Sequence, residues 1–436
     1  MNYSQTIEYL FSRLPMYQRI GAAAYKDNLD NSLFLDKMLG FPHKKFPSVH
    51  VAGTNGKGSV SHLIASVLQE AGYTTGLYTS PHLLDFRERI KINGKMVSED
   101  FVIKFTHRMK ETIELIEPSF FEITVAMAFQ YFAENKVDVV VVETGLGGRL
   151  DSTNIIRPEL SVITNVTLEH TSLLGNTVEK IANEKAGIIK NKVPVVIGRK
   201  KSATDPVFRQ KARQENAEIF FTPDNFNCSF KHNYQKYSVF DVFNKDELVY
   251  TDLLCDLAGS YQSENIATAL KAINILQKSF TKVDSLNITN GIKNVSKNTT
   301  LHGRWEIIQE KPMLVLDIAH NPDAVKNMLR QLENHQFNKL HIVLGMSNDK
   351  NHKEVLSLFP NSATYYFCKP DVPRGLDSAE LTLMAKALNL KGINCNSVDE
   401  AINEALKNAG NTDLILVSGS AFVVAEALKK LNFVSC

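Results

Sequence analysis

Cysteine is scarce in this chain of 436 residues, and the five cysteines lie far apart. Their positions are Cys228, Cys255, Cys368, Cys395 and Cys436, so no CxxC pair occurs. A small disulfide framework uses an even, closely spaced set of cysteines, and a structural zinc site uses cysteine pairs. The sequence therefore indicates neither kind of site, and a reducing cytoplasmic environment fits it best.

The chain also lacks a surplus of charge of either sign. It contains 49 Lys and Arg against 47 Asp and Glu, and the two signs are mixed along its length. Binding to nucleic acid depends on a concentrated basic surface. We therefore expect no nucleic-acid partner.

Long apolar runs are absent too. No stretch approaches the roughly 18 uncharged residues that a membrane span needs, and Glu8, Arg13 and Arg19 interrupt the apolar positions near the start. We expect a soluble cytoplasmic protein without a targeting segment or a membrane partner. We also expect it to act as a monomer.

What the chain does contain is an alternation of β-rich runs and amphipathic helical stretches, which is typical of parallel sheets with crossover helices. In the first part we expect strands at 47–52, 74–79, 137–142, 160–166 and 193–197, and helices at 99–116, 121–135, 177–190 and 262–278. In the last part we expect strands near 313–318, 339–345, 363–368 and 412–417, and helices near 322–333, 378–389, 398–408 and 421–431.

The predicted fold class is therefore α/β. A polar, asparagine-rich stretch at 281–300 indicates a domain boundary. We expect an N-terminal P-loop ATPase-like domain with a mostly parallel sheet over 1–295. A smaller Rossmann-like α/β domain is expected over 296–436.

A glycine-rich run, Gly53-Thr54-Asn55-Gly56-Lys57-Gly58-Ser59, lies between the first expected strand and its helix. Free backbone N–H groups and the helix dipole favour an anion at such a turn, and Lys57 could reach nucleotide phosphates. The spacing departs from GxxxxGK[ST], because Gly58 intervenes before Ser59. A tight turn without a ligand is the alternative, but a lysine at a helix start is then electrostatically unfavourable.

Three polar residues follow expected strands at one sheet edge. Glu143 ends the valine-rich strand, Ser80 follows the strand at 74–79, and His170 follows the strand at 160–166. Carboxyl ends of parallel strands gather ligands in open α/β sheets, and a carboxylate suits magnesium. Taken singly, Glu143 could be a capped loop acid and His170 a polar residue satisfied at a strand end.

Further motifs follow along the chain. They are Thr79-Ser80-Pro81-His82-Leu83 with Arg87-Glu88-Arg89-Ile90, Glu143-Thr144-Gly145-Leu146-Gly147-Gly148-Arg149-Leu150-Asp151, Glu169-His170-Thr171, Glu184-Lys185-Ala186-Gly187-Ile188, His302-Gly303-Arg304 and Asp317-Ile318-Ala319-His320-Asn321-Pro322. Together with the phosphate loop and the preceding His50-Val51-Ala52, they resemble the Mur-ligase superfamily, and in particular its folylpolyglutamate synthase branch. Two positions depart from the usual pattern, since Glu169 and Asn351 stand where many relatives have Asp.

The resemblance implies an ATP-dependent ligase and assigns roles to individual residues. ATP would be bound by Thr54, Asn55, Gly56, Lys57, Gly58 and Ser59, by Asn265 on the adenine side, and by Arg304 and Asp317 at phosphate and ribose. Magnesium would be held by Ser80, Glu143, His170 and Lys185. The folate substrate would be bound by His82, Arg87 and Arg89 in a folate-side loop. Ser420 is a weaker candidate for binding glutamate. Catalysis would rest on Lys57, Lys185, Arg304 and His320.

Lys185 depends most on the resemblance. Taken alone, it would be a solvated helix lysine. In relatives the matching lysine is carbamylated by carbon dioxide and becomes a carboxylate-like metal ligand, so we expect a carbamylated Lys185. The Asp317 motif likewise has a plain interpretation, as a strand end followed by the helix-initiating Pro322.

The implied reaction joins L-glutamate to folate, and to dihydropteroate as well. ATP would phosphorylate the acceptor carboxylate, and the glutamate amine would attack the acyl phosphate, with ADP and phosphate as products. Closure of the two domains would keep water away. One alternative is a Mur-type amino-acid ligase for a cell-wall precursor, and another is a non-enzymatic nucleotide switch, which would need ordered switch loops rather than paired metal ligands.

Overall fold

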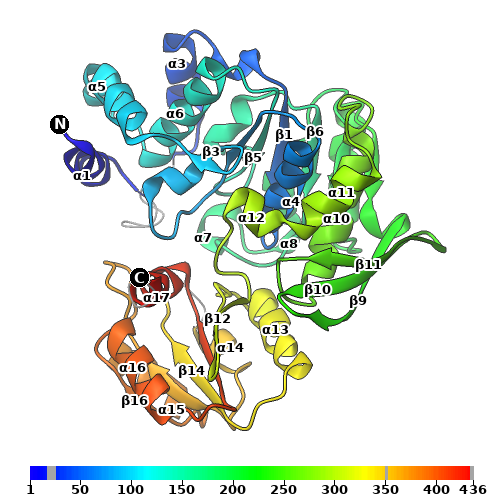
Figure 1. Ribbon diagram of the computed structural model, residues 1–436. Coiled ribbons are helices and arrows are strands. Elements are labelled where there is room, and N and C mark those ends of the chain that lie inside the picture. The colour runs from blue at the N-terminus through cyan, green and yellow to red at the C-terminus, as the bar shows by residue number, and fades with distance from the viewer. Residues whose placement is uncertain (17–25, 349–351, 433–436) are drawn as a thin grey trace. The chain divides into compact units, whose positions relative to one another are not determined.

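The structure, a computed structural model, describes residues 1–16, 26–348 and 352–432. It divides into two compact units, which are coloured blue to green and yellow to red in Figure 1. Unit 1 comprises Met1–Asp256 and Gln262–Leu301, and unit 2 comprises Leu257–Tyr261 and His302–Cys436. The asparagine-rich stretch at 281–300 is helical and belongs to unit 1, as α11 (Ser285–Lys293) and α12 (Val295–Thr299).

Unit 1 is built on a mostly parallel sheet in the order β4-β3-β2-β5-β1-β6-β7-β8. The strands are β1 (Ser48–Ala52), β2 (Thr75–Tyr78), β3 (Ile90–Ile92), β4 (Lys95–Met96), β5 (Val139–Glu143), β6 (Leu160–Ile163), β7 (Val195–Ile197) and β8 (Ile219–Phe221). The five predicted strands are confirmed, with ends that differ by at most three residues. The antiparallel strands β3 and β4 and the edge strand β8 were not predicted.

Helices enclose this sheet on both sides. The predicted ones are α4 (Lys57–Glu70), α5 (Glu99–Ile116), α6 (Phe120–Glu134), α8 (Val178–Ala186) and α10 (Gln262–Leu276), and α8 ends earlier than expected. Others are α1 (Tyr3–Arg13), α3 (Asp30–Met38), α7 (Thr171–Leu174) and α9 (Asp205–Gln214). Val140 and Val142 pack with α5 and α6 in one apolar core, while α4 contacts β1, β2 and β5. The all-valine strand is therefore buried on both faces, as its sequence predicts.

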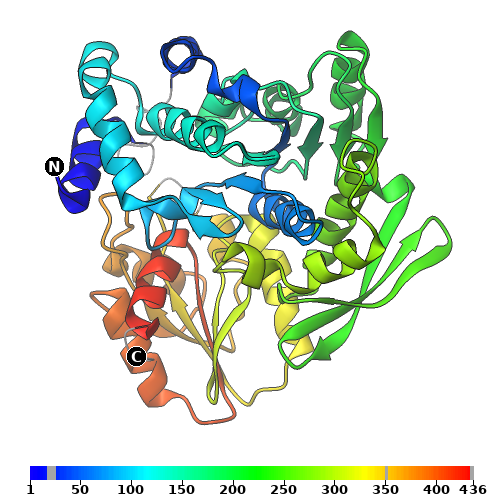
Figure 2. The same ribbon diagram turned by 45° about the horizontal axis from the view of Figure 1, so that its top comes forward.

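An antiparallel sheet of β9 (Phe226–Tyr234), β10 (Tyr237–Asn244) and β11 (Glu247–Cys255) was missed by the sequence analysis. It lies beside α10 in unit 1 (Figure 2). Much of β9 and β11 is exposed. Polar side chains therefore interrupt the apolar alternation that would identify these strands.

Unit 2 has its own sheet, in the order β12-β13-β17-β14-β15-β16. Its strands are β12 (Glu306–Glu310), β13 (Met313–Leu316), β14 (Leu340–Leu344), β15 (Thr364–Phe367), β16 (Gly392–Asn394) and β17 (Leu414–Ser418). Its helices are α13 (Pro322–Gln331), α14 (His352–Leu356), α15 (Ser378–Lys386), α16 (Val398–Asn408) and α17 (Ala421–Asn432). The predicted strands and helices are confirmed, whereas the antiparallel β12, the edge strand β16 and the short helix α14 were not predicted.

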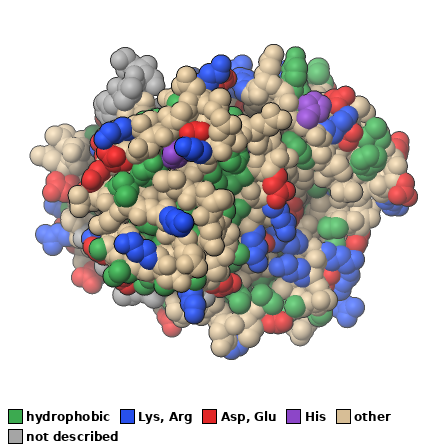
Figure 3. Space-filling model, turned by 90° about the horizontal axis from the view of Figure 1, so that it is seen from below, with side chains coloured by type: hydrophobic (Ala, Val, Ile, Leu, Met, Phe, Trp, Pro, Cys, Tyr) green, Lys and Arg blue, Asp and Glu red, His purple; other side chains and the backbone are tan. Residues whose placement is uncertain are grey.

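No helix in the described parts of the chain is both long enough and apolar enough to cross a membrane. Lys and Arg side chains share the face shown in Figure 3 with Asp and Glu side chains. This mixture agrees with the near balance of 49 basic and 47 acidic residues.

The contact between α4 and α11 depends on a glycine. A Cβ added to Gly291 would lie 2.6 Å from Cα of Val67, and the Ser66 hydroxyl donates to the Gly291 carbonyl over 2.6 Å. The two helix backbones thus approach closely, and this contact holds the helix that follows the glycine-rich turn.

We expect Gly291→Ala to lower the free energy of unfolding by about 1–3 kcal/mol, because the helices must separate to admit the methyl group. Helix propensity alone would give a gain of about 1 kcal/mol. Urea unfolding would measure the difference. Leu286→Ala on the same helix is the control, since Leu286 is 63% exposed. A more stable Gly291→Ala protein would contradict the close packing.

Candidate active site

The glycine-rich turn joins β1 to α4, as predicted. Helix α4 begins at Lys57, and Gly56 before it has φ of +80°, a left-handed conformation that glycine adopts without strain. The Lys57 ammonium donates to the carbonyls of Gly53 and Thr54, over 3.1 Å each. The basic group is therefore held over the turn and next to the N-terminus of α4, where an anion would sit.

Residues after β6 support this turn, and sequence reasoning missed them. The Asn165 side chain accepts from the Asn55 N–H over 2.9 Å, and its carbonyl accepts from the Thr54 N–H over 2.9 Å. The Thr164 hydroxyl donates to the Asn55 carbonyl over 2.6 Å. The feature that could have identified Thr164 and Asn165 is their position directly after β6, a strand that pairs with β1.

Asn265, the residue predicted on the adenine side, lies against the same turn. A Cβ on Gly56 would overlap the Asn265 side-chain oxygen. The Asn265 amide nitrogen donates to Oε1 of Gln262 over 2.7 Å. Glycine at this position thus lets α10 approach the turn.

Glu143 and Ser80 are brought together at the carboxyl edge of the sheet. Glu143 pairs in register with Val51, and its carboxylate accepts from the Ser80 N–H over 3.3 Å. Glu143 is only 4% exposed. A buried carboxylate requires compensating charge or hydrogen bonds, so this position suits a cation.

Lys185 is not a solvated helix lysine, and that interpretation is wrong. It lies in the last turn of α8, is 3% exposed, and donates to the Gly53 carbonyl over 2.6 Å. Burial and the neighbouring charge of Lys57 lower the pKa of Lys185 to about 7, against the opposing influence of Glu169 and Asp151. Lys57 and Lys185 therefore converge on one carbonyl oxygen.

The contact that positions Lys185 joins the backbone and side chain of Arg149 to Glu184. The Arg149 N–H donates to the Glu184 carbonyl over 2.7 Å, and the Arg149 guanidinium meets the Glu184 carboxylate at 2.9 Å. A Cβ on Gly187 would overlap the backbone of Arg149. The motifs at 143–151 and 184–188 are thus two sides of one close packing contact.

Asp151 organises the interior of this contact, a role that the sequence analysis did not assign. Its carboxylate accepts from the Leu146 N–H over 2.7 Å and from the Thr153 hydroxyl. The Thr153 oxygen in turn contacts Nε2 of His50 at 2.8 Å. Burial raises the pKa of Asp151 and lowers that of His50 to about 3, so the histidine stays neutral.

His170 follows β6 with φ of +50° and precedes α7, on the loop that also carries Glu169. In the described residues, no three His, Cys, Asp or Glu side chains gather as a metal-holding group. The assignment of Ser80, His170 and Lys185 as further ligands beside Glu143 stays a prediction.

The predicted folate-side residues form a small cluster of their own. Arg89 donates to Nδ1 of His82 over 2.7 Å, and burial together with Arg89 keeps the pKa of His82 well below its ordinary value. Arg87 instead pairs with Asp85 at 2.7 Å. The ring of Phe11 in α1 stacks on His82 with centroids 6.1 Å apart.

Arg304, Asp317, His320 and Ser420 belong to unit 2. Asp317 follows β13 and is 4% exposed, and Nδ1 of His320 meets the Ile318 carbonyl at 2.9 Å. The Ser420 hydroxyl accepts from the Val423 N–H at the start of α17 over 3.2 Å, which is a helix-capping contact. Asn351, one of the two departures from the pattern of relatives, lies outside the described residues.

Comparison with known proteins agrees with this arrangement. The family model described as Mur ligase middle domain matches residues 51–273, and that of the Mur ligase glutamate ligase domain matches residues 303–421. The dihydrofolate synthase/folylpolyglutamate synthase of Bacillus subtilis is 34% identical over 407 residues, which cover 90% of this chain and 92% of the relative.

Solved structures are similar over the whole chain. Escherichia coli FolC, in complex with DHPP and ADP, has a TM-score of 0.87 and 27% identity, and the match covers 100% of this chain and 99% of that one. The bifunctional folylpolyglutamate synthase/dihydrofolate synthase of Yersinia pestis, complexed with AMPPNP and a Mn ion, has a TM-score of 0.83 and 26% identity, with 99% and 98% covered. This chain therefore belongs to the Mur ligases, and within them to the dihydrofolate synthase/folylpolyglutamate synthase family.

Proposed function

We propose that this chain uses ATP to join L-glutamate to dihydropteroate and to reduced folates, with ADP and phosphate as products. The observation that carries the proposal is the convergence of Lys57 and Lys185 on the Gly53 carbonyl, at the turn between β1 and α4. Lys57 and the helix N-terminus, joined by the Lys185 ammonium while that lysine is unmodified, make a site for an anion of high charge. The relatives described above supply the substrate class.

Amide formation in water needs an activated carboxylate. The γ-phosphoryl group of ATP is transferred to the acceptor carboxylate, and the glutamate amine then displaces phosphate from the acyl phosphate. Charge grows on the phosphoryl oxygens during transfer. Lys57 and the N–H groups at the start of α4 face that charge, and they are already in place before the reaction begins.

The residues present at the sheet edge fit a magnesium ion. Glu143 offers a buried carboxylate, Ser80 lies beside it, and His170 follows β6, the strand on the other side of β1. When bound, magnesium supplies positive charge to the phosphates. Arg304, Asp317 and His320 keep the phosphate, ribose and reaction-centre roles that the resemblance gives them, and Ser420 remains the glutamate-site candidate.

The surroundings of Lys185 favour the carbamate that the resemblance implies. The Lys185 ammonium first releases a proton to solvent, and the neutral amine nitrogen then adds to the carbon of carbon dioxide and releases a second proton, so that a cation becomes an anionic carbamate. A pKa of about 7 leaves a large neutral fraction at neutral pH, whereas an ordinary lysine is almost fully charged. The product would place two anionic oxygens beside Lys57.

The test of function uses purified protein with ATP, magnesium and labelled glutamate, with dihydropteroate in one reaction and tetrahydrofolate in another. We expect labelled products with both acceptors, and ADP release that requires both acceptor and glutamate. ADP release that needs neither would favour the nucleotide switch. Neither that switch nor the cell-wall ligase is proposed, because the relatives are dihydrofolate or folylpolyglutamate synthases.

Lys57→Ala should lower kcat by about 10²–10³-fold or more, because it removes a charge that stabilises the transferring phosphoryl group. The circular dichroism spectrum should stay unchanged. Lys271→Ala is the control, since Lys271 is a buried lysine of the same unit that lies 4.4 Å from the centre of the Phe220 ring. Normal turnover in Lys57→Ala would contradict the assignment of the glycine-rich turn as a phosphate-binding loop.

Lys185→Ala should lose most activity, and acetate or formate in the buffer should restore part of it by supplying a carboxylate in the vacated space. Lys185→Arg should not be rescued, because the guanidinium keeps its positive charge and fills the space. A ¹³C NMR signal from ¹³CO₂-treated wild type should be missing in both variants. Lys180→Ala, an exposed change on the same helix, is the control. A wild type without the ¹³C signal would contradict the carbamate.

A further inference from the structure

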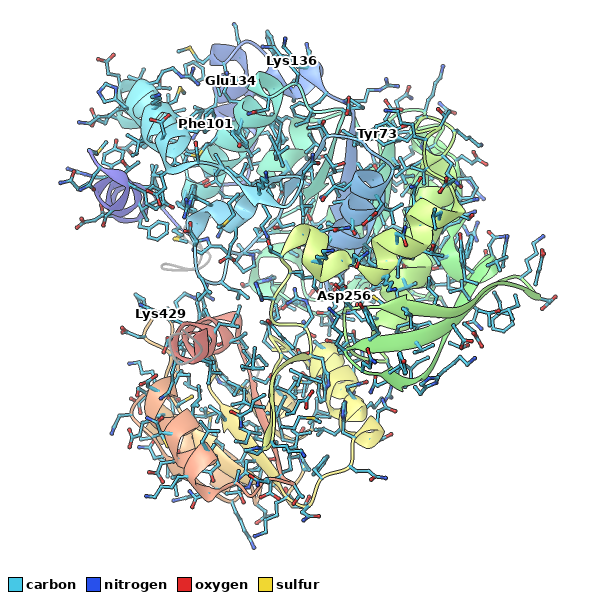
Figure 4. The ribbon with its side chains drawn as sticks, in the orientation of Figure 1. Tyr73, Phe101, Glu134, Lys136, Asp256 and Lys429 are labelled. Carbon is cyan, nitrogen blue, oxygen red and sulfur yellow. The ribbon has the colours of Figure 1, made fainter. Side chains whose placement is uncertain are left out.

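A short run of chain, Leu257–Tyr261, belongs to unit 2 although the residues on both sides of it belong to unit 1. We call it the strap. On its N-terminal side Asp256, labelled in Figure 4, accepts from the N–H groups of Ser296 and Lys297 at the start of α12. On its C-terminal side Gln262 begins α10. Unit 1 therefore fixes both ends of the strap.

The strap is held in unit 2 by specific contacts. The Ser260 N–H donates to Oε1 of Gln331 over 2.7 Å, and Ala258 and Tyr261 pack against the core of unit 2. Gly259 has φ of +110°, and a Cβ there would lie 2.7 Å from the Tyr261 ring. The backbone thus turns sharply at a glycine, and the tyrosine ring folds back across it.

The turn delivers the Tyr261 hydroxyl to Asp317, where it donates to Oδ2 over 2.8 Å. The same oxygen accepts from the Trp305 N–H over 3.0 Å, and Oδ1 accepts from the Ala319 N–H over 2.9 Å. These bonds use three of the roughly four acceptor positions of a carboxylate. The two backbone donors and the tyrosine together set the rotation of the carboxylate plane.

We propose that Tyr261 is a positioning residue for the nucleotide, which acts by orienting the Asp317 carboxylate toward the ribose hydroxyls. The inference rests on the proposed function, because it needs ATP as a ligand. Asp317 directly follows a parallel strand of an open α/β sheet, which is where such folds place an acid on a ribose. Three of the acceptor positions of Asp317 are filled, so the carboxylate can accept a hydrogen bond from a ribose hydroxyl only if its remaining lone pair is directed toward that hydroxyl.

Charge supports the geometry. Burial raises the pKa of Asp317, while the Tyr261 hydrogen bond, the charge of Arg304 and the two backbone bonds lower it. Loss of the phenol would therefore weaken the ionised form as well as free its rotation. Both effects reduce the strength with which a ribose hydroxyl can donate to this carboxylate.

A purely structural role is the competing explanation, and the ribose distinguishes the two. We would measure the affinity of the full chain for ATP and for 2′,3′-dideoxy-ATP, which lacks the ribose hydroxyls. In Tyr261→Phe the dissociation constant for ATP should rise about tenfold, the size expected for a lost hydrogen bond to a charged group. The dissociation constant for the dideoxy analogue should stay unchanged.

Tyr365→Phe is the matched control. Tyr365 is a buried tyrosine of unit 2 whose hydroxyl donates to the Pro360 carbonyl over 2.6 Å. Its variant loses a comparable hydrogen bond and should keep the wild-type preference for ATP. In a double-mutant cycle, Tyr261→Phe should add little to Asp317→Asn, because both act through one carboxylate.

Equal loss of ATP and dideoxy-ATP affinity in Tyr261→Phe would overturn the inference, as would an unchanged preference for ATP or a wild type that does not distinguish the two nucleotides. The proposed function fails separately, if the wild type binds no ATP or makes no labelled product from acceptor and glutamate. A wild type that passes those tests beside an unaffected Tyr261→Phe would reject only the positioning role.

Discussion

The site depends on one carbonyl oxygen, that of Gly53, to which both Lys57 and Lys185 donate. Lys57 reaches it because α4 begins directly after the glycine turn. Lys185 reaches it because α8 packs through Gly187 onto the backbone of Arg149. The strand, the turn and two helices therefore meet at this point, and a shift of any one would separate the two ammonium groups.

Two like charges so close together are costly without anions nearby. The depressed pKa of Lys185 expresses that cost, since burial and Lys57 disfavour its charged form while Glu169 and Asp151 favour it. Polyphosphate binding to Lys57, or conversion of Lys185 to an anion, would each relieve the repulsion. The electrostatics of the free protein thus favour the same two events that the proposed reaction needs.

The sequence predicted the parallel sheets and the phosphate turn because each carries a local signal, such as the unbroken valines of β5. It did not predict the antiparallel sheet at 226–255, whose exposed strands lack a clear apolar alternation. Lys185 shows a second limit. Its burial is set by contact with a turn 132 residues away in the chain, and periodicity within one helix cannot report such a contact.

Tertiary structure also explains the strap, which in the sequence is only a short connection of mostly small or apolar residues before a helix. Tyr261 and Gln262 are consecutive, yet Tyr261 donates to Asp317 in unit 2 and Gln262 accepts from Asn265 in unit 1. Asn265 in turn lies against Gly56 of the phosphate turn. Tyr261 and Gln262 share one peptide bond. A change in the backbone there would therefore displace contacts of both Asp317 and Asn265, the candidate nucleotide-binding residues of the two units.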